Sequence, residues 1–171
     1  IDPTSLTTAV LAINDLSDAL VENKSVWLGN DPSSTTDEAS ANIAVGTTAL
    51  DAVTTGDFNI AIGHQSLTNN TSGETNVAIG YGTLQNSTDY DNNIAIGYAA
   101  MQLADGSHTS VAIGNYTLRD ATTGHSNIAI GHGAQQFTSI EKHNIGIGIS
   151  SLKNVAGTTG SEGSYNVGIG S

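Results

Sequence analysis

The sequence predicts an all-β protein built as a parallel β-solenoid, and three observations lead to this fold class. First, a five-residue motif of the form Asn-Ile-Ala-Ile-Gly recurs along most of the 171-residue chain. Second, the closing glycines of the motif repeat with a constant 17-residue period from Gly29 to Gly148, and the last interval, to Gly170, is longer. Third, each motif alternates bulky and small residues, which is the period of a β-strand. Such self-similarity is typical of a solenoid, and nine closing glycines predict about nine rungs.

Each motif predicts one short strand that pairs in parallel with the equivalent strand of the next unit. Stacking in this way places like residues above one another, at a spacing of about 4.8 Å. We expect the second bulky position to form a buried column, which comprises Ile62, Ile79, Ile96, Ile113 and Ile130. We expect the small position to face a close neighbour on the opposite side, and this column comprises Ala61, Ala78, Ala95, Ala112 and Ala129.

A second regular feature follows each motif glycine. A small residue and then Leu or Met stand three and four positions later, as in Ser66-Leu67 and Ala100-Met101. We interpret this pair as part of a second strand, whose Leu or Met meets the Ile/Val column inside a flattened coil. The rest of each unit, such as residues 54–57, is rich in Gly, Asn, Asp and Thr and predicts turns.

The N-terminal part of the chain has a different pattern. Residues 1–23 contain no glycine, and Leu6, Ile13 and Leu20 stand seven apart. This spacing predicts a helix over residues 1–24, either as a three-stranded coiled coil or as one amphipathic helix over the open end of the solenoid. The β-roll domain then covers residues 25–171. Since the chain ends directly after a strand motif, we expect it to be a segment of a longer fibre.

Composition excludes several classes of partner. The chain has 4 Lys plus Arg against 16 Asp plus Glu, so its formal net charge is −12. Nucleic acids and anionic lipid surfaces are bound through basic patches, so we expect neither as a partner. Hydrophobic content of 37% with 5% aromatic residues is thin for one ordinary core, but suits a narrow core shared along a rod. No apolar run is long enough to insert into a membrane.

The motif resembles a known family. Val77-Ala78-Ile79-Gly80, with Thr83 after it, resembles the head repeat of trimeric autotransporter adhesins, although the adhesin unit is shorter and its Asn stands one position earlier. The 17-residue form, as in residues 59–75, is similar to repeats in bacteriophage tail-fibre and related surface proteins. The resemblance covers residues 25–171. It implies a left-handed β-roll, a homotrimer, and an extracellular location on a virion tail fibre or a bacterial cell surface.

The same resemblance implies a function in attachment. The expected partners are two further copies of the chain, other segments of the fibre, and a glycan or protein receptor on a host cell. Two alternatives remain at this stage: a segment of a β-solenoid enzyme that degrades polysaccharides, and an ice-binding solenoid. The Thr-Thr pairs at 54–55, 122–123 and 158–159 suggest ice binding, but these pairs skip rungs.

Candidate site residues are few. We identify no catalytic residues, no metal site and no cofactor, although Asp89 and Asp91 around Tyr90 resemble half of a calcium loop. The position after the motif glycine carries planar side chains in several units, and the receptor- or glycan-contacting candidates are His64, Tyr81, Tyr98 and His132. Stacking at a turn is the alternative role for this column. The remaining histidines are read as loop residues without a common register, and they are His108, His125 and His143.

Overall fold

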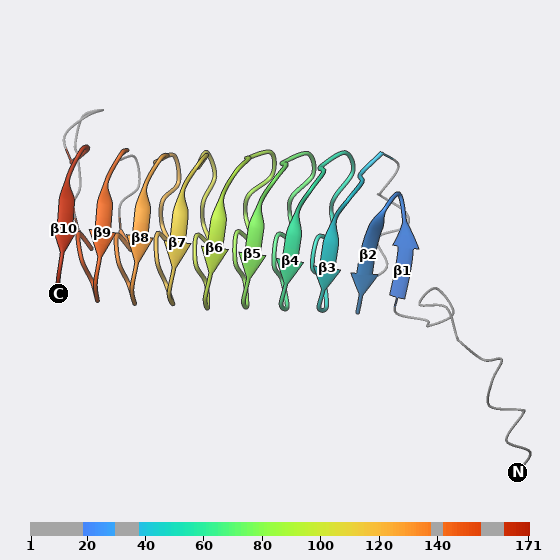
Figure 1. Ribbon diagram of the computed structural model, residues 1–171, viewed down its shortest axis with the longest axis horizontal. Helices are drawn as coiled ribbons and strands as arrows, with labels where there is room; N and C mark the ends of the chain where they lie inside the picture. Colours follow the sequence, from blue (N-terminus) through green and yellow to red (C-terminus); the bar gives the residue numbers. More distant parts are fainter. Residues whose placement is uncertain (1–18, 30–37, 138–141, 155–162) are drawn as a thin grey trace, which may run out of the picture.

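The computed structural model describes residues 19–29, 38–137, 142–154 and 163–171, and over these the protein is a parallel β-solenoid without helices. One sheet runs along the rod in the order β1 to β10, with the strands side by side (Figure 1). The strands are β1 (Ala19–Glu22), β2 (Ser25–Leu28), β3 (Ile43–Val45), β4 (Ile60–Ile62), β5 (Val77–Ile79), β6 (Ile94–Ile96), β7 (Val111–Ile113), β8 (Ile128–Ile130), β9 (Ile145–Ile147) and β10 (Val167–Ile169). All neighbours from β2 onward pair in parallel.

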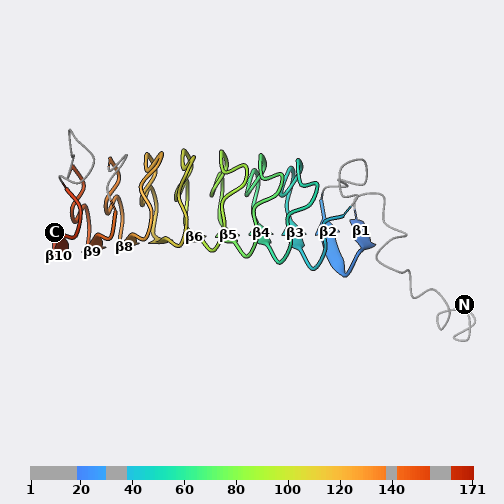
Figure 2. The ribbon, with the colours of Figure 1, turned by 90° about the horizontal axis from the view of Figure 1, so that it is seen from above.

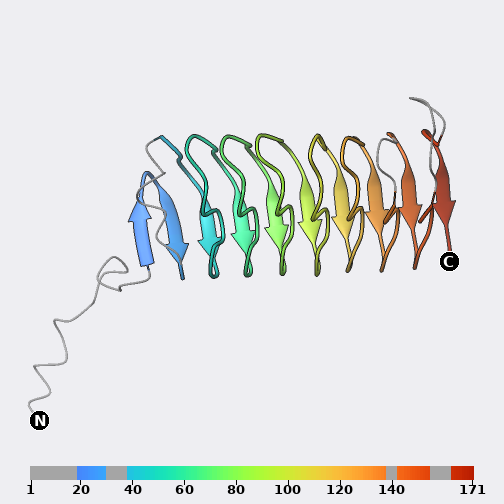
Figure 3. The ribbon, with the colours of Figure 1, turned by 180° about the vertical axis from the view of Figure 1, so that it is seen from behind.

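The 17-residue period is confirmed. Strands β3 to β9 begin at this constant spacing over six successive intervals, so the regular part of the solenoid has about six turns. The prediction of nine rungs includes turns that contain residues 30–37 and 155–162, and these lie outside the described residues. The number nine therefore stays a prediction. The strands follow one side of the rod and the rest of each turn returns along the other (Figures 2 and 3).

The expected N-terminal helix is wrong where the structure describes it. Residues 19–22 form β1, which pairs antiparallel with β2, and Leu20 is the register partner of Trp27. Asn23 and Lys24 join the strands with φ of 45° and 62°, the left-handed pair that a tight hairpin turn requires. Pairing with the first rung therefore overrides the helical spacing at residues 19–24. The heptad residues Leu6 and Ile13 lie outside the described residues, so the coiled coil stays a prediction.

The two faces of the sheet are the reverse of the expected ones. The middle residue of each strand from β3 to β9 is small and points into the coil, and Ala61, Ala78, Ala95, Ala112 and Ala129 are fully buried. In β2 the equivalent position is held by Trp27, which is also fully buried. The bulky residues point out of the coil, and the exposed fractions of Ile62, Ile113 and Ile130 are 38%, 37% and 36%. Alternation places neighbouring strand residues on opposite faces, and in the regular turns a small residue, alanine or glycine, leaves room inside for the returning segment.

The returning segment supplies the large core residues. Its Leu and Met side chains are fully buried and share one core cluster with the alanines, and these residues are Leu50, Leu67, Leu84, Met101 and Leu118. Their burial inside the coil was expected. The second strand was not found, because this segment is a succession of turns, and its core partner is the alanine column instead of the isoleucines.

Left-handed backbone at non-glycine positions explains these turns. In the unit that begins at β4, Gln65, Leu67 and Thr75 have φ of 59°, 50° and 57°, and the same positions are left-handed in the other described units. Each such residue costs roughly 1–2 kcal/mol. Hydrogen bonds between turns offset this cost: Leu67 N donates to Thr83 O at 3.0 Å, and Thr75 N donates to Asp57 O at 3.0 Å.

The motif glycine is required by the close approach of successive turns. Gly97 has φ of +131°, and a Cβ built on it would lie 2.6 Å from the carbonyl carbon and oxygen of Gly114. No L side chain fits this position without moving the backbone of the next turn.

A ladder of buried asparagines precedes the strands. Asn76 N donates to Asn59 Oδ1 at 3.0 Å, and Asn93 N donates to Asn76 Oδ1 at 3.0 Å. Side-chain amides in the ladder also bind loop carbonyls, as where Asn93 Nδ2 donates to Ser107 O at 2.7 Å. Ser110 replaces Asn in one turn, and its Oγ accepts from Asn127 N at 3.2 Å. The ladder satisfies buried backbone groups that a parallel sheet with three-residue strands leaves unpaired.

Candidate functional site

The four residues predicted after the motif glycines lie along the edge at which the strands end. The rings of Tyr81 and Tyr98 stack with centroids 5.1 Å apart and an interplanar angle of 7°. His64 lies against Tyr81 at 5.4 Å with a tilt of 44°. The expected distance of about 5 Å between the two tyrosines on adjacent rungs is therefore confirmed. Their role in binding stays a prediction.

Tyr116 completes the column, although the sequence did not point to it. Asn115 occupies the predicted position in this turn, but its Oδ1 accepts from Tyr98 N at 3.0 Å. Tyr116, one residue later, contacts Tyr98 at 5.2 Å and His132 at 5.9 Å between centroids. The signal was hidden because Tyr116 stands one position out of the repeat register. We call the five residues the aromatic ladder, and they are His64, Tyr81, Tyr98, Tyr116 and His132.

The aromatic ladder is accessible to a ligand. Tyr81 and Tyr98 are 43% and 45% exposed, and both histidines are exposed. Because Tyr81 and Tyr98 stack on each other, a ligand would meet their ring edges and hydroxyl groups, which suit the hydroxyl groups of a sugar ring. Stacking at a turn and ligand contact are therefore both compatible with this geometry.

Arg119 lies beside the ladder, and Lys153 lies near the same Phe137 ring as Arg119. The guanidinium carbon of Arg119 is 5.8 Å from the centroid of Tyr116 and 5.5 Å from that of Phe137. The ammonium of Lys153 is 5.5 Å from the same Phe137 ring. Asp120 binds Arg119 through two hydrogen bonds of 2.9 Å, and this contact raises the pKa of the guanidinium. No motif in the sequence pointed to this group.

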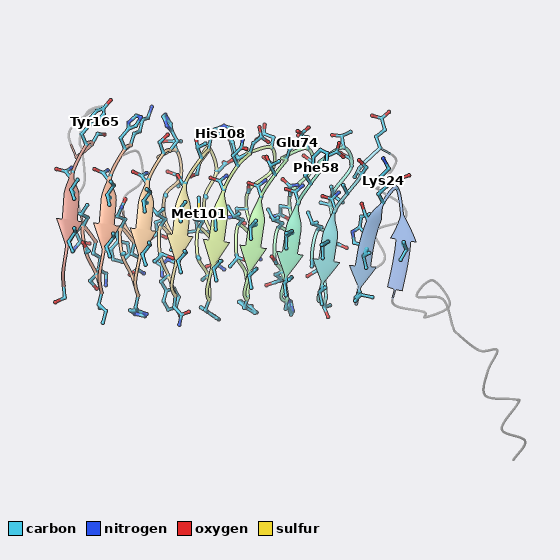
Figure 4. The ribbon with its side chains drawn as sticks, in the orientation of Figure 1. Lys24, Phe58, Glu74, Met101, His108 and Tyr165 are labelled. Carbon is cyan, nitrogen blue, oxygen red and sulfur yellow. The ribbon has the colours of Figure 1, made fainter. Side chains whose placement is uncertain are left out.

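The opposite edge, at which the strands begin, carries a second column. His108 and His125 stand exactly one repeat apart and share a repeat position with Lys142, so the expectation that these histidines have no common register is wrong for this pair. Asp57, Glu74 and Asp91 hold the same position in the preceding turns. Figure 4 shows Glu74, His108 and Tyr165 along this edge.

The half calcium loop is built into the fold by its own hydrogen bonds. Asp91 Oδ1 accepts from Glu74 N at 2.7 Å, and Thr88 Oγ1 donates to Asp89 Oδ1 at 3.2 Å. Tyr90 packs edge-on against His108 at 4.8 Å, and burial, followed by Asp105 and Asp89, raises the pKa of its hydroxyl. Among the described residues, no three His or acidic side chains gather as metal ligands.

A column of single threonines is continuous over three turns, although the Thr-Thr pairs themselves do skip rungs. Thr54, Thr71 and Thr88 occupy one repeat position before Asp105 interrupts the series. Thr54 Oγ1 donates to Thr71 O at 3.0 Å, and Thr71 Oγ1 donates to Thr88 O at 3.0 Å. These hydroxyl protons are used within the fold, so they do not form a free donor array for ice.

The described surface has no pocket, and no helix within it has the length and apolar character needed to cross a membrane. Fold and surfaces together define a parallel β-solenoid with ordered side-chain columns on both edges of its sheet. Comparison with protein-family models, curated proteins and solved structures finds no match to this chain.

Proposed function

We propose that this chain is a structural and attachment segment of a homotrimeric fibre, a left-handed β-roll on a phage tail fibre or a bacterial surface, without catalytic activity. The proposal joins the resemblance of the repeat to trimeric surface proteins with one structural observation. That observation is the aliphatic face on the outer side of the sheet.

The aliphatic face supports assembly. Its Ile and Val residues stand at the first and third positions of each strand and repeat along the whole row of parallel strands. Ile43, Ile94 and Ile128 are 43%, 37% and 38% exposed, although the core of the single chain is complete without them. Contiguous apolar patches of this kind are rare on monomers and typical of interfaces. The number three and the left hand come from the resemblance alone.

Light scattering on the intact chain tests the assembly. We expect a mass of three times 17.4 kDa. Ile113→Asp places a charge on the aliphatic face and should shift the mass toward that of the monomer, whereas Thr123→Asp, on an exposed loop residue, should not. A clean monomer of the unmodified chain at micromolar concentration would refute the trimer.

The aromatic ladder supports the attachment function, and we propose a host-surface glycan or protein receptor as its partner. Parallel stacking of Tyr81 on Tyr98 leaves ring edges and hydroxyls at the surface, where sugars can lie across several rungs. Changing both tyrosines to Ala should abolish binding to host cells while trimer mass and melting temperature stay nearly unchanged. Tyr90→Ala, at the other edge, is the matched control. Unchanged binding in the double variant would reject the ladder as the contact.

A further inference from the structure

The column at the edge where the strands begin changes its chemistry halfway along the rod. Its first half is acidic, with Asp57, Glu74 and Asp91, and its second half carries His108, His125 and Lys142 on consecutive turns. His143, in the adjacent column, lies 5.6 Å from His125 and stacks on Tyr165 with centroids 4.8 Å apart and an angle of 3°. We call the second half the His/Lys edge, and it comprises His108, His125, Lys142 and His143.

The acidic half has a role inside the fold that His108 still shares and Lys142 does not. Asp57 Oδ1 accepts from Ser40 N at 2.7 Å, and Asp91 does the same for Glu74 N. His108 continues the series, because its Nδ1 accepts from Asp91 N at 3.3 Å. Lys142 carries only donors and is unable to accept such a bond. The Lys142 side chain therefore accepts no hydrogen bond from a backbone N of the preceding turn, as Asp57, Asp91 and His108 do.

The groups whose charge lowers the pKa of His125 are all basic. Burial lowers its pKa first, and then Lys142, His143 and His108 lower it further. The backbone N of Asp91 donates to His108 Nδ1, and the Asp105 carboxylate acts on Tyr90. Neither carboxylate contributes to the shift in the pKa of His125. Glu141 lies outside the described residues. The chain has a net charge of −12, so a cluster of basic side chains is unexpected on its surface.

We propose that the His/Lys edge is a binding site for an anionic group, a carboxylate or a sulfate-like oxyanion, that strengthens as pH falls. A proton taken up by His125 adds a donor and a positive charge in the turn next to Lys142. A bound anion would relieve the mutual repulsion of these cations. The site is independent of the aromatic ladder and of trimer formation.

The chain's five histidines allow a test with internal controls. NMR titration of the intact protein from pH 8 to 5.5 would be run with sodium sulfate, with glucuronate and with glucose at matched ionic strength. Both anions keep their charge over this range. We expect both anions to raise the pKa of His125 and glucose to have no effect, and the ring signals of His64 and His132 on the ladder serve as internal controls. Each unit by which a bound anion raises the pKa of His125 should appear as about a tenfold gain in affinity across the titration.

Variants separate a site from general ionic effects. Lys142→Gln removes the permanent cation of the edge, so it should raise the pKa of His125 without anion and weaken anion binding several-fold. Lys153→Gln, beside Phe137, should change neither. The stronger of the two anions identifies the group recognised. An equal shift of all five histidines, or none at His125 with either anion, would overturn the proposal.

Discussion

Removing one rung of the asparagine ladder should destabilise the protein strongly. Asn93 is fully buried, its Oδ1 accepts from Ser110 N at 3.0 Å, and its Nδ2 donates to Ser107 O at 2.7 Å. Asn93→Ala removes both contacts and leaves a donor and an acceptor without these partners inside the coil. An unsatisfied buried polar group costs about 1–3 kcal/mol, so the loss should be about 2–6 kcal/mol.

The chain itself provides the matched control. Ser110 occupies the ladder position of the next turn, and its Oγ still accepts from Asn127 N. Asn93→Ser should therefore keep the acceptor for Ser110 N and lose the contact to Ser107 O, at about half the cost of the alanine variant. Urea unfolding followed by circular dichroism, at one fixed protein concentration, measures the order wild type, Ser, Ala. An alanine variant within about 0.5 kcal/mol of wild type, or a serine variant no better than alanine, would refute this account of the ladder.

Three further substitutions test the packing, each by the same unfolding measurement. Ala95→Leu should lose about 1–3 kcal/mol because the coil has no room beside the Leu and Met column, and a variant as stable as its parent would contradict the inward alanine face. Leu84→Ala should lose about 2–5 kcal/mol, and in a monomeric background it should exceed Ile113→Ala, whose side chain is 37% exposed. Gly97→Ala should lower the free energy of unfolding more than Gly133→Ala does, because a Cβ at Gly133 meets only the ends of side chains at 3.4 Å or more. Equal losses of stability would show that the left-handed φ alone matters, and not the close approach of the next turn.

Much of the fold could be predicted because the repeat is strict. The constant spacing of the motif located the parallel strands up to β9, and the motif itself located β10, which pairs in register after a longer turn. The direction of the faces could not be predicted in the same way. Alternation shows which residues share a face, but only the width of the coil decides that Ala95 points inward and Ile96 outward.

The missed features have physical reasons too. Left-handed residues such as Leu67 and Thr75 carry no compositional signal, because hydrogen bonds between turns impose their conformation. The strand at residues 19–22 depends on pairing with β2, which local spacing does not show. The common register of His108 and His125, in contrast, could have been predicted, because one full repeat of 17 residues separates them in the sequence.

The central claim is that the alanine face closes the core of each chain and the aliphatic face is covered by other copies. The chain has no cysteine, so single-cysteine variants can be labelled cleanly with a maleimide. Ala112→Cys should stay protected in the native protein, and Ile113→Cys should be protected in the assembly but react once Ile79→Asp disrupts it. Thr123→Cys is the exposed reference. Labelling of Ile113→Cys in the native protein as fast as that reference would contradict the claim.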